Sequence, residues 1–233
     1  MTDTTGFRRA GMRDGWQAIA HSVADLRYVL VPLIYVNVLW IACCLPIITL
    51  PAATAALYVV TQTMNERRDV SWREFIQAMK DHFFAGWRWV LVNALVGLIL
   101  VSNIAFYIVL PVRIAPYLAA AWIGVVLAWV TIQLYCYPVL LMQAERRVLW
   151  AVRNSVILIL RHPLYAIPYV ITVGFFVFVT WVTPYFLVVI TPALIAFLTN
   201  GAVLYLVEVE HGNDPEKSLK RFLVTPNNKK RKR

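Results

Sequence analysis

Charged side chains are absent from four long stretches of the chain. These stretches are 28–64, continuing through Asn65, then 89–112, 114–144 and 162–207. Each is longer than the roughly 20 residues that an α-helix needs to cross a hydrocarbon core about 30 Å thick. All 12 Asp and Glu residues lie outside them. The pattern predicts an all-α, polytopic helical membrane protein.

Two of the stretches are long enough for two crossings each. A continuous helix over 28–64 would be about 55 Å long, and one over 162–207 about 69 Å. Proline breaks helices, and it stands where each stretch could fold back, at Pro46 and Pro51 in the first and Pro184 in the last. The other two stretches predict one span each. We therefore predict about six transmembrane helices, arranged as three hairpins.

The basic residues assign sides to these spans, because Lys and Arg gather in the cytoplasmic loops of membrane proteins. With six spans and both termini in the cytoplasm, 21 of the 22 basic residues lie inside and Arg113 alone lies outside. Five spans would leave at best 17 inside. The stretch from Pro51 to Met64 is short, so a half-length helix that dips into the bilayer is the alternative to a full crossing there.

The same pattern divides the chain into a cytoplasmic N-terminal segment (1–27), a single membrane domain (28–207) and a basic cytoplasmic tail (208–233). Within the membrane domain, three hairpins alternate with two cytoplasmic linkers, in the order 28–64, linker 65–88, 89–144, linker 145–161 and 162–207.

Each linker is predicted to be an amphipathic helix lying on the membrane. In the first, Ser71 and Glu74 have the spacing of a capping box, which satisfies backbone N–H groups at a helix start. Large apolar side chains then recur at helical spacing on one face, at Trp72, Phe75, Met79 and Phe83. Lipid anchoring explains such a face, and docking of a partner protein is the alternative.

The sequence shows no set of side chains with the spacing of a catalytic or metal-binding site. The four histidines lie at or beyond the edges of the uncharged stretches, and the three cysteines have no CxxC spacing. A phosphate-binding loop is missing, as are the buried charges typical of proton-coupled transporters. We therefore predict no enzymatic activity, no cofactor and no metal site.

The polar side chains within the predicted spans have two explanations. Hydrogen bonding between helices is the more common one, and a path for an uncharged polar solute is the other. In the first turn, proline frees backbone carbonyls, and a threonine hydroxyl can satisfy one of them. The candidates for a functional turn or a solute-facing surface are Asn37, Trp40, Pro46, Thr49, Pro51 and Tyr58.

The net charge of +10 is concentrated most strongly in the run 229–233 at the end of the tail. Each basic residue near a membrane surface contributes about 1 kcal/mol of attraction to anionic lipid. The tail is therefore predicted to contact anionic lipid of the bilayer rather than nucleic acid.

Segments 37–40 (NVLW) and 45–58 (LPIITLPAATAALY) resemble the YesL family of bacterial membrane proteins. The first linker fits that family's aromatic and basic pattern at Trp72, Phe75, Lys80 and Phe83. The resemblance implies a plasma-membrane protein with no established catalytic residues. Genes of this family often lie near genes for carbohydrate uptake and two-component sensing, which implies a non-enzymatic accessory with a membrane permease or sensor protein as its partner. A small transporter for an uncharged polar solute such as a sugar is the alternative.

Overall fold

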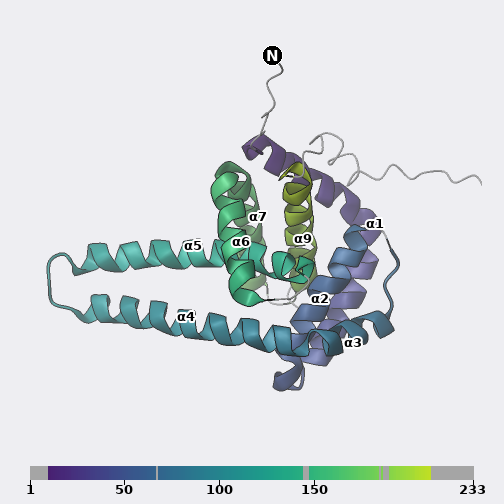
Figure 1. The fold of residues 1–233 in the computed structure, drawn as a ribbon, viewed down its shortest axis with the longest axis horizontal. Coiled ribbons are helices and arrows are strands. Elements are labelled where there is room, and N and C mark those ends of the chain that lie inside the picture. Colours follow the sequence, from purple (N-terminus) through teal and green to yellow (C-terminus); the bar gives the residue numbers. More distant parts are fainter. Residues whose placement is uncertain (1–9, 67, 144–146, 184, 186–188, 211–233) are drawn as a thin grey trace, which may run out of the picture.

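The computed structural model describes residues 10–66, 68–143, 147–183, 185 and 189–210, which form helices and no strand (Figure 1). The elements are α1 (Met12–Cys44), the short 3-10 helix η1 (Ile47–Thr49), α2 (Leu50–Asn65), α3 (Trp72–Asp81), α4 (Phe83–Val109), α5 (Ala115–Met142), α6 (Val148–Arg161), α7 (Pro163–Val182) and α9 (Thr191–Glu210). The predicted all-α class is confirmed.

Within the described residues, five helices are long and apolar enough to cross a membrane. They are Ile47–Asn65 (η1 with α2), α4, α5, α7 and Thr191–Val209 in α9. The first predicted span, Tyr28–Cys44, is apolar but shorter, because it is the second half of the 33-residue helix α1. These five helices are compatible with a multi-pass membrane protein, and the sixth span stays a prediction.

The helices break where the prolines predict. Pro46 precedes η1 in an extended conformation, and Pro51 lies in the first turn of α2. Proline is favourable in a first turn because the N–H that it lacks has no partner there. In the last uncharged stretch, α7 ends at Val182 and α9 begins at Thr191, whereas Pro184 lies outside the described residues.

Helices α1, α2 and α9 form a bundle with two distinct ends. The turn end consists of residues 45–51, and the linker end consists of residues 65, 66 and 68–70. Asn37 of α1 contacts Ala193 near the start of α9, and Ser22 of α1 lies near Gly201 farther along α9. These contacts set α1 antiparallel to α9, and α2 therefore runs in the same direction as α9.

The first linker returns along α2 instead of lying apart from the bundle. The predicted capping box is present, with the Glu74 N–H donating to Ser71 Oγ and the Ser71 N–H donating to Glu74 Oε2. Phe75 is fully buried in the core that α1, α2 and α9 share. The helix ends at Asp81, so Phe83, predicted to lie on the face of the linker helix, is instead the first residue of α4.

This return brings the beginning of α4 to the turn end of the bundle. The indole N–H of Trp87 donates to the carbonyl of Ile48 over 3.1 Å. Gly86 lies directly against the Pro51 backbone, since a Cβ at Gly86 would be 2.5 Å from the Pro51 carbonyl oxygen. The first linker thus carries the chain from the linker end to the turn end of the bundle.

Helices α4 and α5 extend together away from the rest of the molecule (Figure 1). Only 6% of the most apolar 18-residue segment of α4 is buried. Three hydrogen bonds between side chains tie the two helices together near the bundle. Asn93 and Trp89 both donate to Gln133 Oε1, and Trp129 donates to Asn93 Oδ1. The exposed remainder is mostly apolar, as expected for helices that face lipid.

Candidate functional site

Three polar side chains in the middle of the bundle are fully buried and bonded across helices. We name Asn37, Thr61 and Asn200 the polar belt. Asn200 Nδ2 donates to the carbonyl of Tyr58 (2.7 Å) and to Thr61 Oγ1 (2.9 Å), and the Ala193 N–H donates to Asn37 Oδ1 (3.2 Å). All three residues have 0% exposure. The belt therefore joins α1, α2 and α9 directly.

A turn-end cavity of about 330 Å³ lies between α1, α2, α7 and α9. It is lined by Trp40, Thr54, Leu57, Tyr58, Val177, Thr180, Thr191, Pro192 and Ile195. Two predicted solute-facing residues, Trp40 and Tyr58, are thus brought together. The indole N–H of Trp40 donates to Thr54 Oγ1 at 3.2 Å, and the hydroxyls of Thr180 and Thr191 are 2.8 Å apart. Because these polar side chains are bonded to one another, the wall that the cavity presents is mostly apolar.

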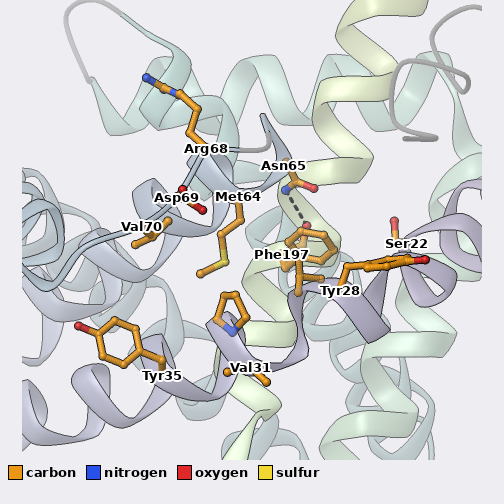
Figure 2. Close-up of a pocket in the computed structure, with 12 residues that line it drawn as sticks. Ser22, Tyr28, Val31, Tyr35, Met64, Asn65, Arg68, Asp69, Val70 and Phe197 are labelled. Carbon is orange, nitrogen blue, oxygen red and sulfur yellow. Dashed lines mark hydrogen bonds between the residues drawn. The ribbon is translucent and has the colours of Figure 1, made fainter. Parts of the chain in front are cut away.

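A larger linker-end cavity of about 520 Å³ lies between α1, the end of α2, the chain after it and α9 (Figure 2). It is lined by Ser22, Tyr28, Val29, Val31, Pro32, Tyr35, Met64, Asn65, Arg68, Asp69, Val70 and Phe197. The two cavities have no lining residue in common. Along α1 and α2, the polar belt lies between them.

Two oxygens converge at the inner edge of the linker-end cavity. Asn65 Nδ2 donates to the carbonyls of Thr61 (3.2 Å) and Phe197 (3.1 Å), which turns its Oδ1 toward Gly201. A Cβ at Gly201 would be 3.5 Å from Asn65 Oδ1 and 3.8 Å from Ser22 Oγ. A methyl group at this position would be in ordinary van der Waals contact with both oxygens, so the two oxygens lie near the same point of α9.

The outer edge of this cavity carries charge of both signs. The Arg68 guanidinium extends outward and pairs with Glu66 at 2.8 Å, and the next residue, Asp69, is also exposed (Figure 2). Among the residues that the structure describes, no group of three or more His, Cys, Asp or Glu side chains is placed to hold a metal ion. The arrangement suits binding of a polar group at the edge and an apolar group within.

The predicted turn residues form the turn itself and do not line either cavity. The Thr49 hydroxyl bonds the carbonyls of Cys43 and Pro46, as the sequence predicts. Pro46 is exposed at the tip of the turn, and the Pro51 backbone is covered by Gly86 of α4. Their observed role is to end α1 and to begin α2.

The predicted docking face of the first linker packs mainly on the protein itself. Phe75 is fully buried and Met79 is partly buried against the core of α1, α2 and α9, whereas Trp72 keeps 54% of its surface exposed. Phe83, in α4, stacks edge-to-face on Phe84 with ring centroids 5.5 Å apart. Intramolecular packing therefore accounts for much of this face, and lipid anchoring and partner docking both stay predictions for Trp72.

The turn end of the bundle, α2, α3 and most of α4 fall within one matched segment. Residues 33–104 match a family model described as "Protein of unknown function, DUF624". DUF624 is the YesL-like family. The match thus supports the resemblance seen in the first hairpin and first linker, and it assigns no activity. No curated protein and no solved structure matches the chain.

Sequence reasoning did not find the residues of the linker-end cavity. Ser22, Asn65 and Asp69 lie at the edges of uncharged stretches, where polar residues are ordinary, and Phe197 looks like any apolar residue of a span. They meet only because α9 returns beside the end of α2. Pairing of helices that are far apart in sequence leaves no local signal.

Proposed function

We propose that this chain is an integral plasma-membrane protein, with both termini in the cytoplasm, that assists carbohydrate uptake or sensing without catalysing a reaction. Its partner in this proposal is a membrane permease or a sensor protein. The proposal is supported by the family match, by the gene surroundings that the resemblance implies, and by the basic residues on one predicted side.

The closed polar belt is the observation that favours an accessory over a carrier. A path for a polar solute needs side-chain amides and hydroxyls that can exchange bonds with the solute. Asn200 instead donates its amide hydrogens to two acceptors on α2, and Asn37 Oδ1 accepts from a backbone N–H of α9. Direct bonds between membrane helices of this kind are typical of packing contacts.

The test is uptake of labelled sugars by cells that lack this chain but keep the permease at an unchanged amount. We expect uptake of at least one sugar, or the induction of its uptake, to fall in these cells. Expression of the wild-type chain should restore it. Unchanged uptake and induction across a broad panel of sugars would contradict the proposed role.

A small transporter for an uncharged polar solute is the second candidate, and one observation favours it. The two cavities lie toward opposite ends of the same bundle, with the polar belt between them. Carriers bind substrate near the bilayer midplane and open alternately to either side. A transporter would move solute in liposomes without any other protein, whereas an accessory would not.

A further inference from the structure

The linker-end cavity combines an apolar interior with a polar edge. Met64 and Phe197, which line it, are both buried (Figure 2). Val29 and Pro32 of α1 add further apolar lining. Its volume of about 520 Å³ falls within the range of about 300–1,000 Å³ that ligand sites occupy. An apolar segment of a ligand would be covered there, and a polar segment would be left at the edge.

The edge lies where an apolar helix ends. Ile47–Asn65 is one of the candidate spans, and charged residues begin directly after it, at Glu66. This is the level at which lipid headgroups meet a membrane protein. Arg68 and Asp69, adjacent in sequence, present one positive and one negative charge there.

We infer that the linker-end cavity binds one zwitterionic phospholipid from the surrounding bilayer, with an acyl chain against Phe197 and Met64 and the headgroup at Arg68 and Asp69. The inference goes beyond the accessory role, which does not depend on it. An ammonium group complements the Asp69 carboxylate, and a phosphate complements a guanidinium.

The Arg68–Glu66 pair does not prevent this arrangement. Both side chains are largely exposed, at 68% and 47%, and exposed ion pairs contribute little in water. A phosphate can therefore share the Arg68 donors. The phosphate is common to both lipid classes, so the preference depends on Asp69, where a zwitterionic head places an ammonium group and an anionic glycerol head places none.

The test compares phosphatidylethanolamine with phosphatidylglycerol of the same acyl chains, by native mass spectrometry of the purified full-length protein. The blocking variant is Val31→Trp, because Val31 lines the cavity and is 74% exposed, so an indole can enter the cavity without disturbing the core. The control is Val38→Trp, on the same helix, 53% exposed and not lining the cavity. We expect Val31→Trp to lower phosphatidylethanolamine occupancy at least tenfold, and Val38→Trp to leave it unchanged.

Charge variants test the headgroup separately and do not touch the core. Asp69→Asn should reduce the preference for phosphatidylethanolamine over phosphatidylglycerol by about tenfold, the size of one charge-assisted hydrogen bond. Its control is Asp81→Asn on α3, which removes the same charge outside the cavity and should keep the preference.

Four results would overturn the inference. One is equal retention of phosphatidylethanolamine by the two Trp variants, and another is equal affinity of the wild type for the two lipids. The third is binding of glycerophosphoethanolamine, the head without chains, as tightly as the lipid. The fourth is an unchanged lipid preference in Asp69→Asn, and this comparison decides the matter even where a Trp variant folds poorly.

Discussion

Replacing Gly86 with Ala should destabilise the protein, because a methyl group at this position meets backbone that cannot rotate away. The new Cβ would lie 2.5 Å from the Pro51 carbonyl oxygen and 2.8 Å from the carbonyl carbon. Ordinary contact begins at 3.4 Å, so α4 and α2 would have to separate by about 0.9 Å, the difference between 3.4 and 2.5 Å. Separation at this site would also stretch the Trp87 hydrogen bond to Ile48.

The magnitude follows from two opposing effects. Overpacking of a tight contact costs about 1–3 kcal/mol. Alanine in a helix is more favourable than glycine by about 0.5–1 kcal/mol. Gly97→Ala and Gly124→Ala are matched controls, because a Cβ at either position meets no atom within 4 Å. Relative to these controls the helix term cancels, so Gly86→Ala should be less stable by the full 1–3 kcal/mol or so.

Thermal unfolding of the purified variants in one detergent measures this difference. We expect Gly97→Ala and Gly124→Ala to unfold at or slightly above the wild-type temperature. Gly86→Ala should unfold several degrees below them, at about 2–4 °C per kcal/mol for a chain of this size. Equal unfolding temperatures for the three variants would refute the placement of α4 against the turn end of the bundle.

Three further predictions test the belt, the turn and the topology. Asn200→Leu should lower the stability of the protein by about 0.6–1.7 kcal/mol, the range for hydrogen bonds between membrane helices. Asn103→Leu is the control and should have little effect, because the Asn103 amide donates within α4; equal unfolding temperatures of the two variants would count against the belt. Joint replacement of Pro46 and Pro51 by Ala should favour one continuous helix and so cause loss of fold or inverted orientation; unchanged topology and stability would show that the hairpin does not need them. In a chain whose native cysteines have been replaced, Arg113→Cys should react with a membrane-impermeant reagent from outside the cell, and cysteines introduced into either linker should not. External labelling of a linker would exclude the six-span topology.

Local features of the fold could be predicted because each depends on neighbouring residues. The uncharged stretches predict the apolar helices, Pro46 and Pro51 mark the first break, and Ser71 with Glu74 marks the start of α3. The Thr49 hydroxyl bonds carbonyls within six residues of itself, so its role was also predictable.

Long-range packing could not be predicted, for a physical reason visible in α3. An apolar helical face has the same sequence pattern whether lipid, a partner or its own bundle covers it, so the burial of Phe75 against α2 has no separate signal. Gly86 likewise gives no sign in the sequence that Pro51 will lie against it. The linker-end cavity depends on the same long-range contacts, through Asn65 and Phe197.

Solute flux into liposomes that contain only this purified protein is the most direct test of the proposed accessory role. The polar belt closes the bundle between the two cavities, so the account predicts that labelled uncharged sugars accumulate no faster than in protein-free liposomes. Saturable sugar accumulation by the wild-type protein alone, altered by a substitution at Asn200, would contradict the account and establish a transporter.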